Sequence, residues 1–438
     1  MEREITWKLI RWKDSKRRKP LLLTGVRQCG KTYVIKAFGE RCFENTVYLN
    51  FEENGRLSAL FDDDYDVYRI IREIEITQRT VITPGKTLLI MDEIQECPRA
   101  ITSLKYFCEN MLELHVVCAG SLLGVALKRE NISFPVGKVN RMQMFPMNFR
   151  EFVMASGMTD SLELLKKKEI DRPIPALYSV PFEKLLKEYY IVGGMPEAVK
   201  VWQASHDVSE IEEIQNEILN DYADDFAKHA PLNQVEKIRW IWDSVPKQLA
   251  KENNKFVFSH VKKGKRSAEL EDALQWLQDA GLVVQLELVE KPEIPLSSVS
   301  NAAYFKVYFS DVGLLRCKSR LSAETIWEGN ALFMQYKGAF AENYVLNELR
   351  SQGESVYFWR SGNTAEVDIL TESQGQIIPM EVKSADNVQA KSYRLFCKKY
   401  SPAVGFKFSM KNAGENLCEK TRTISLPLWM VWNWKEYL

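Results

Sequence analysis

GVRQCGKT, residues 25–32, is the most informative stretch of this 438-residue chain. It fits the pattern G-x-x-x-x-G-K-[ST], and it lies between an apolar segment typical of a strand, residues 20–24, and a helix-like segment, residues 31–38. Glycines allow such a loop to curl so that its N–H groups face phosphate oxygens at a helix N-terminus, where the helix dipole favours negative charge. The stretch therefore predicts a phosphate-binding loop (P-loop).

The loop predicts ATP and Mg²⁺ as cofactors. Lys31 would reach the β- and γ-phosphates, and the hydroxyl of Thr32 would bind Mg²⁺, a hard cation that prefers oxygen ligands. The residues expected to surround the nucleotide follow one another along the chain: Gly25, Val26, Arg27, Gln28, Cys29, Gly30, Lys31, Thr32 and Tyr33.

A second motif agrees with the first. Residues 88–93 read LLIMDE, which is typical of a buried parallel strand that ends in two carboxylates and looks like a Walker B motif. Asp92 would hold the magnesium, and Glu93 would orient or deprotonate the water that attacks the γ-phosphate. The next strand-like segment, HVVCAGS, ends in Ser121, which would contact the γ-phosphate or the water. Two successive acids predict hydrolysis as well as binding.

Composition limits the class of protein and its location. Apolar residues make up 45% and charged residues 27%, and 59 basic residues balance 59 acidic ones, so we expect globular domains without a chain-wide attraction to nucleic acid or membrane. A local basic patch stays compatible with this total. No segment is typical of a signal peptide or a membrane span, which predicts a cytoplasmic protein. The eight cysteines and four histidines show no metal-site spacing.

The hydrophobic pattern predicts an α/β protein with four parts. Up to residue 152, short apolar runs alternate with amphipathic stretches, as in a parallel sheet covered by helices. Residues 153–232 read as helices. Residues 233–325 read as three helices, 235–250, 259–261 and 267–280, followed by paired strands at 282–288 and 304–310, which suggests a winged helix. Residues 326–438 contain helices at 334–350 and 387–399 and strands at 355–360, 365–371 and 376–382.

The last part carries a candidate acid–lysine site. Glu342 lies on the apolar stripe of its helix, and burying a lone carboxylate is costly unless a metal or a lysine compensates it. Asp368 lies within a strand, and Glu381 and Lys383 lie on one face of the next strand because strand side chains alternate. We therefore expect the four side chains to converge.

These motifs together resemble a family of prokaryotic AAA+-type ATPases. The resemblance rests on GVRQCGKT, LLIMDE with the following IQECP, CAGSLLG, FPVGKV, FPMNFREF and GGMPEAV, and it covers nearly the whole chain. It implies a P-loop NTPase fold with an AAA+/ASCE-type parallel sheet, followed by a helical lid, a winged helix and a restriction-endonuclease-like domain. It also implies an arginine finger, for which Arg129 and Arg141 are candidates that the sequence does not separate.

The order of the acids resembles the PD-(D/E)xK nuclease motif, with Val367 in place of the proline. In that resemblance Asp368 and Glu381 bind Mg²⁺, Lys383 activates water or stabilises the developing charge, and Glu342 assists the metal site. The implied chemistry is phosphodiester hydrolysis.

Two hypotheses of different classes follow. In the first, the chain is an ATPase whose nucleotide state repositions a winged helix and a nuclease-like domain on DNA, with phosphates contacted by Lys262, Lys263, Lys265 and Arg266. In the second, ATP sets a switch, the C-terminal fold is inactive, and the output is recruitment of a protein partner or regulation of DNA. A homo-oligomer is suggested by AAA+ relatives, and a third reading treats the C-terminal domain as an oligomerisation scaffold only.

Overall fold

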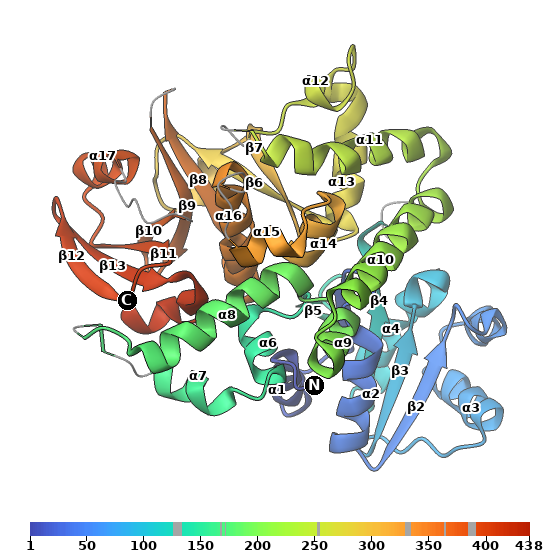
Figure 1. Ribbon diagram of the computed structural model, residues 1–438. Coiled ribbons are helices and arrows are strands. Elements are labelled where there is room, and N and C mark those ends of the chain that lie inside the picture. Colours follow the sequence, from blue (N-terminus) through green and yellow to red (C-terminus); the bar gives the residue numbers. More distant parts are fainter. Residues whose placement is uncertain are drawn as a thin grey trace. The chain divides into compact units, whose positions relative to one another are not determined.

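The computed structural model describes residues 1–125, 134–166, 169–170, 172–251, 255–328, 334–362, 365–383 and 391–438 (Figure 1). The chain forms two compact units. Unit 1 comprises Met1–Pro146 and Asp279–Gly281, and unit 2 comprises Met147–Gln278 and Leu282–Leu438. Among the described residues, no helix is both long enough and apolar enough to cross a membrane.

Unit 1 is built on a five-stranded parallel sheet. The strand order is β2-β3-β4-β1-β5. The strands are β1 (Leu21–Gly25), β2 (Asn45–Asn50), β3 (Thr87–Asp92), β4 (His115–Gly120) and β5 (Asn140–Met144). β3 and β4 are buried along their whole lengths, as expected of central parallel strands covered on both faces. The predicted α/β fold with a parallel sheet is therefore confirmed for this unit.

Helices cover both faces of this sheet. α2 (Lys31–Cys42) lies on one face, and α3 (Val67–Gln78) and α4 (Pro98–Asn110) lie on the other, where they build a core with the short helices η1 (Gly55–Phe61) and η2 (Ile94–Glu96) (Figure 1). α3 starts at Asp66, whose side chain accepts a hydrogen bond from the N–H of Tyr68. α4 starts with a proline, which the first helical position tolerates. α1 (Ile5–Lys13) precedes the sheet in the chain.

Unit 2 begins with helices. They are α6 (Phe149–Ala155), α7 (Thr159–Lys166), α8 (Ala176–Val192), α9 (Pro196–Ser205), α10 (Val208–His229), α11 (Leu232–Leu249), α12 (Phe258–Val261) and α13 (Ser267–Asp279). α6 has a capping box, in which the side chain of Asn148 accepts the N–H of Glu151 and the side chain of Glu151 accepts the N–H of Asn148. The expected helices between residues 153 and 280 are present.

The GGMP turn between α8 and α9 leaves no room for a side chain at its two glycines. A Cβ at Gly194 would lie 2.0 Å from the carbonyl oxygen of Met147, and a Cβ at Gly193 would lie 2.2 Å from the carboxylate of Asp311. Asp311 caps α14 (Val312–Lys318) by accepting the N–H of Leu314, and it also accepts the N–H of Gly194. The two glycines therefore let the turn close onto a buried carboxylate.

An eight-stranded sheet runs through the rest of unit 2, with the order β12-β13-β11-β10-β9-β8-β6-β7. Its strands are β6 (Val283–Val289), β7 (Ser300–Phe309), β8 (Val356–Ser361), β9 (Ala365–Ser373), β10 (Gln376–Val382), β11 (Val404–Ser409), β12 (Gly414–Cys418) and β13 (Thr421–Pro427). The accompanying helices are α14, α15 (Ala323–Glu328), α16 (Met334–Ser351), α17 (Lys391–Tyr400) and the final 3₁₀ segment η5 (Leu428–Tyr437).

The expected wing does not stand alone. β6 and β7 pair in antiparallel fashion, as predicted, but β6 also pairs in parallel with β8 through Glu287–Tyr357, Leu288–Phe358 and Val289–Trp359. The free edge of a strand offers unpaired N–H and C=O groups, and here β8 satisfies them. The expected winged helix and the expected C-terminal domain therefore share one sheet across residue 325.

The compact units do not test the expected domain boundaries. Unit 1 ends at Pro146, and α6 lies in unit 2. The expected boundaries after residues 152, 232 and 325 therefore stay predictions. The assignment of the remaining parts as a helical lid, winged helix and nuclease-like domain stays a prediction.

Candidate functional site

The loop between β1 and α2 has the backbone that its sequence predicts. Gly30, the residue before α2, has a left-handed conformation with φ 93°, which glycine adopts without strain. A Cβ at Gly25 would lie 2.4 Å from the carbonyl oxygen of Met144 on the neighbouring β5. Gln28 has φ 64°. The loop therefore needs glycine at both motif positions, one for space and the other for backbone conformation.

Lys31 turns back over this loop. Its Nζ donates hydrogen bonds to the carbonyl oxygens of Gly25 and Val26, both at 3.0 Å, and the side chain is buried. These carbonyls hold the ammonium group over the loop, where the P-loop motif predicts that the phosphates bind. An ammonium group there can exchange neutral carbonyl partners for phosphate oxygens.

Asp92 is the centre of the polar contacts at the end of β3. Its Oδ2 accepts hydrogen bonds from Thr32 Oγ1 at 2.7 Å and from the Tyr48 hydroxyl at 2.9 Å, and its Oδ1 accepts the N–H of Glu93 at 3.0 Å. The carboxylate is buried, and three donors compensate its desolvation. The structure thus brings Thr32 and Asp92, the two predicted magnesium ligands of unit 1, into direct contact.

Glu93 follows Asp92 in an unusual conformation. Its φ of 49° and ψ of 45° lie in the left-handed region, which a non-glycine residue adopts only when its surroundings hold it there. Its Oε2 accepts a hydrogen bond from Gln95 Nε2 at 2.6 Å and a longer one from Ser121 Oγ at 3.5 Å. Ser121 follows β4, which lies between β1 and β3 in the sheet. The predicted catalytic pair Glu93 and Ser121 is therefore in contact.

The other predicted nucleotide residues differ in exposure. Val26 and Cys29 are buried, and the Cys29 carbonyl oxygen accepts a hydrogen bond from Arg3 at 2.9 Å. Arg27 and Gln28 are half-buried. Tyr33, by contrast, is 61% exposed on α2 and lies beside the N-terminal amine rather than in the loop.

Two site residues were missed by the sequence reasoning. Tyr48 on β2 donates to Asp92, and burial together with the negative charge of Asp92 raises the pKa of Tyr48, so the hydroxyl stays protonated as a donor. Gln95 holds the carboxylate of Glu93. The alternation of polar Tyr48 and Asn50 with apolar Val47 and Leu49 on β2 was the available signal for the first residue. Gln95 belongs to the IQECP stretch that follows LLIMDE, but no role was predicted for it.

The arginine-finger candidates have different outcomes. Arg129 lies outside the described residues. Arg141 is exposed on β5, and its guanidinium lies 4.3 Å from the ring centroid of Phe134. Neither arrangement tests the predicted role.

In unit 2 the predicted acids and lysine come together on one sheet face. Lys383 Nζ lies 2.6 Å from Glu381 Oε1 and 4.0 Å from Asp368 Oδ2, and Asp368 Oδ2 accepts the N–H of Val382 at 2.8 Å. The charge of Glu342 also acts on Asp368 and Glu381. Burial and the neighbouring carboxylates raise the pKa of Asp368, and burial raises that of Glu381. Asp368, Glu381 and Lys383 therefore meet as predicted, and Lys306, which lies within 4 Å of both Glu342 and Glu366, connects Glu342 to the strand that carries Asp368.

A second lysine, which the sequence did not indicate, belongs to this cluster. Lys306 on β7 lies 3.3 Å from Glu342 and 2.6 Å from Glu366, and its side chain is 1% exposed. Burial would lower the pKa of Lys306, but the negative charges around it, with Glu342 foremost, hold that pKa well above its usual value. Tyr308 on the same strand donates to Glu342 at 2.6 Å. Here we call Lys306, Glu342, Glu366, Asp368, Glu381 and Lys383 the acid–lysine cluster.

The cluster fits a divalent cation only in part. Within the described ranges, no three His, Cys, Asp or Glu side chains are grouped so that they could hold a metal ion as they stand. Glu342 is engaged by Lys306 and Tyr308. However, Glu381 Oε2 is buried without a hydrogen-bond partner, and such an oxygen is the donor type that Mg²⁺ prefers. Asp368 and Glu381 are therefore the pair that would fit a cation.

The predicted basic patch before α13 is partly neutralised. Lys265 lies 2.6 Å from Glu269, and Lys262 Nζ lies 4.7 Å from the ring centroid of Trp240. Lys263 and Arg266 are exposed. Trp276 on α13 is buried in the core.

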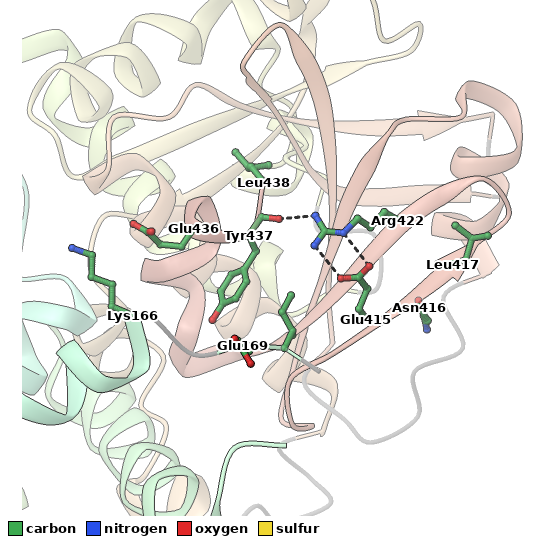
Figure 2. A pocket seen from close by; sticks show the side chains of 10 residues that line it. Lys166, Glu169, Glu415, Asn416, Leu417, Arg422, Glu436, Tyr437 and Leu438 are labelled. Carbon is green, nitrogen blue, oxygen red and sulfur yellow. Dashed lines mark hydrogen bonds and ion pairs between the residues drawn. The ribbon is translucent and has the colours of Figure 1, made fainter. Parts of the chain in front are cut away.

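A pocket in unit 2 lies apart from the predicted residues. Its lining is drawn in Figure 2 and comprises Lys166, Glu169, Ile170, Glu415, Asn416, Leu417, Arg422, Glu436, Tyr437 and Leu438. Arg422 donates to both carboxylate oxygens of Glu415 at 3.0 Å and to the carbonyl oxygen of Tyr437 at 3.0 Å (Figure 2). None of the predicted catalytic, nucleotide or metal residues lines this pocket.

Comparison with family models assigns the first part of the chain. Residues 17–153 match an AAA domain, residues 183–325 match a domain of unknown function (DUF8612), and residues 337–429 match a second domain of unknown function (DUF4143). Residues 17–153 thus form a P-loop ATPase-type domain of the AAA class. The other two descriptions name neither a winged helix nor a nuclease.

The curated proteins and the solved structures do not assign a function to the chain. No curated protein matches the chain. Among solved structures, the Walker-type ATPase PABY2304 of Pyrococcus abyssi is 14% identical, with 72% of this chain and 95% of that chain covered and a TM-score of 0.45. The ORC2 protein of Aeropyrum pernix in ADPNP-ADP complexes is 12% identical, with 76% and 90% covered and a TM-score of 0.38. AMPPCP-bound DnaA from Aquifex aeolicus is 13% identical, with 64% and 87% covered and a TM-score of 0.28.

Proposed function

We propose that unit 1 binds Mg²⁺-ATP at residues 25–32 and hydrolyses it. The observation that carries the proposal is the hydrogen bond between Thr32 and Asp92, because it joins the two motifs at the end of the loop. A hydroxyl and a carboxylate side by side are the hard oxygen donors that Mg²⁺ prefers. Thr32 and Asp92 would hold the ion, which supplies charge neutralisation for the phosphates when it is bound.

The chain's own residues account for the remaining steps. Loop N–H groups and Lys31 bind and orient the phosphates, and Lys31 offers its positive charge to the transferred group. Glu93 accepts the proton of the attacking water, and Gln95 and Ser121 fix the position of its carboxylate. The left-handed backbone of Glu93 aims this side chain away from the direction that a regular strand would give it.

The magnesium assignment is tested by Thr32→Val, which keeps the side-chain volume and removes the hydroxyl. We expect wild-type protein to bind a fluorescent ATP analogue more tightly in Mg²⁺ than in EDTA, and the variant to lose most of that difference. Thr46→Val on β2 is a control for loss of a hydroxyl elsewhere in the unit. An unchanged Mg²⁺ enhancement in Thr32→Val would contradict the assignment.

We propose phosphodiester hydrolysis at the acid–lysine cluster as a second function of the chain. The unpartnered, buried Oε2 of Glu381 supports it, since an unsatisfied buried carboxylate oxygen is costly unless a cation or donor joins it. Asp368 and Glu381 would hold Mg²⁺, which supplies charge stabilisation when bound, while Lys383 stabilises negative charge on the phosphate and Glu342 supports the site. DNA is the proposed substrate and partner.

Nicking of supercoiled plasmid tests this second function. We expect Mg²⁺-dependent nicking by the wild type and its loss in Asp368→Asn, which keeps the shape of the side chain. The alternative is a nucleotide-dependent switch that recruits a protein partner. It would be favoured if wild-type protein leaves the plasmid intact and if DNA does not change the rate of ATP turnover. Mass measured with and without ATP tests the proposed homo-oligomer in the same preparations.

A further inference from the structure

Two cations of unit 2 lie close to the ring of Tyr304 on β7. Lys255 Nζ lies 3.6 Å from the ring centroid, and the guanidinium carbon of Arg360 on β8 lies 5.6 Å from it. Arg360 also donates a hydrogen bond to the Tyr304 hydroxyl. The backbone of Lys255 forms a β-bridge with Lys306, so Lys255 is fixed along β7. We call Lys255, Tyr304 and Arg360 the cationic triplet.

The triplet has no anionic partner in the part of the chain that the structure describes. Neither Lys255 nor Arg360 forms an ion pair there, and Glu366, which lies opposite Arg360 on β9, is instead engaged by Lys306 at 2.6 Å. Partial burial and the positive charge of Arg360 lower the pKa of Lys255. Two like charges held beside one ring repel each other, and an anion bound between them would relieve that repulsion.

The triplet lies next to the acid–lysine cluster. Tyr304 and Lys306 are two residues apart on β7, so their side chains leave the same face of the sheet, about 7 Å apart along the strand. Arg360 faces Glu366, which is two residues before Asp368 on β9. Neighbouring strands are about 4.8 Å apart. A ligand that carries anionic groups at short regular intervals would therefore reach both places.

We propose that the cationic triplet binds a backbone phosphate of a nucleic acid that runs across this sheet face toward the acid–lysine cluster. The planar fork of Arg360 suits two oxygens of one phosphate, Lys255 adds a point charge, and the ring of Tyr304 supports both cations. This inference rests on the proposed phosphodiester function. A nucleic acid fits better than an acidic peptide because its regularly spaced phosphates serve both the triplet and the cluster.

Binding in EDTA tests the triplet without cleavage. The probe is a fluorescein-labelled 20-base-pair DNA, with the matching single strand beside it, and anisotropy is followed at several NaCl concentrations. We expect Lys255→Gln and Arg360→Gln each to weaken binding about tenfold. Each should also make the plot of log affinity against log salt shallower by about 0.9 for duplex and about 0.7 for single strand, as one phosphate contact is lost.

Controls separate a contact from a structural role. Lys200→Gln removes an exposed cation from α9 in the same unit and should leave affinity and salt slope unchanged. Arg360→Lys should restore most of the salt slope and less of the affinity, because the charge returns without the fork. The thermal midpoint of Lys255→Gln should equal or exceed that of the wild type, since a repulsion is removed.

Two results would overturn the inference. In the first, both glutamine variants keep the affinity and the salt slope of the wild type. In the second, the wild-type protein binds neither probe. Failure of the phosphodiester function looks different. In that case the DNA binds and the triplet variants weaken it, but plasmid stays intact in Mg²⁺ for wild-type protein and Asp368→Asn alike.

Discussion

Replacing Lys31 by alanine should weaken ATP binding by a calculable amount. In the nucleotide-free loop, Lys31 Nζ donates two hydrogen bonds to the carbonyl oxygens of Gly25 and Val26, each at 3.0 Å. A hydrogen bond from a charged donor to a neutral carbonyl contributes about 1.5 kcal/mol, and one from a charged donor to a phosphate oxygen contributes about 3 kcal/mol. When ATP binds, each of the two hydrogen bonds of Lys31 therefore gains about 1.5 kcal/mol, which is about 3 kcal/mol in total. The variant loses this gain, which corresponds to a roughly 150-fold increase in Kd.

The assay is equilibrium titration with a fluorescent ATP analogue in Mg²⁺, with urea unfolding of each variant as a check of folding. Lys86→Ala is the matched control, since Lys86 is an exposed lysine of the same unit that pairs only with Glu44 at the surface. Its Kd should equal that of the wild type. A Kd for Lys31→Ala within threefold of the wild-type value would refute the placement of phosphates over this side chain.

Three further predictions test the packing around the site and the fold of each unit. Tyr48→Phe removes one of three donors to Asp92 and should lower the free energy of unfolding by about 1.5 kcal/mol in urea titrations; no loss would remove Tyr48 from the site. Burial and nearby cations lower the pKa of His115 from 6.5 to about 4, so the unfolded chain binds more protons between these values. Stability should therefore fall as pH drops from 6.5 to 4, by about 1–2 kcal/mol from this group because the ring is partly solvated, and His115→Phe should show a smaller fall; equal pH profiles would contradict the argument. Gly194→Ala forces a Cβ into a backbone oxygen and should cost about 1–3 kcal/mol or more, whereas Gly338→Ala, in open space on α16, should stabilise by about 0.5–1 kcal/mol. Equal melting temperatures for the two glycine variants would count against the tight GGMP turn.

Features of the site that depend on short stretches of chain were predictable from the sequence. The strand, loop and helix around residues 20–42 follow from local hydrophobicity and two glycines, and the acids at the end of β3 follow from one apolar run. Parallel strands place their carboxyl ends on one edge of a sheet, so the meeting of Thr32 with Asp92 also followed.

Features that depend on distant pairing were not predictable. The contact of Tyr48 with Asp92 joins residues on two neighbouring strands, and an apolar strand pattern does not specify which polar side chain turns toward a carboxylate. The pairing of β6 with β8 depends on strand edges about seventy residues apart in sequence, which local periodicity does not encode. The same pairing brings β7, and with it Lys306, to the acid–lysine cluster. The sequence therefore did not predict Lys306 as a member of the cluster.

The central claim is that Glu93 acts as the base in ATP hydrolysis. The most direct test measures phosphate release from ATP by wild-type protein and by Glu93→Gln, and then identifies the nucleotide that stays bound. Glu93 Oε2 accepts from Gln95 and Ser121, and glutamine keeps the size of the side chain but is no longer a base. We predict steady turnover by the wild type and a loss of about 10²- to 10⁴-fold in the variant, which retains bound ATP. Turnover by Glu93→Gln at the wild-type rate, or wild-type protein that binds ATP and never releases phosphate, would contradict hydrolysis at this site.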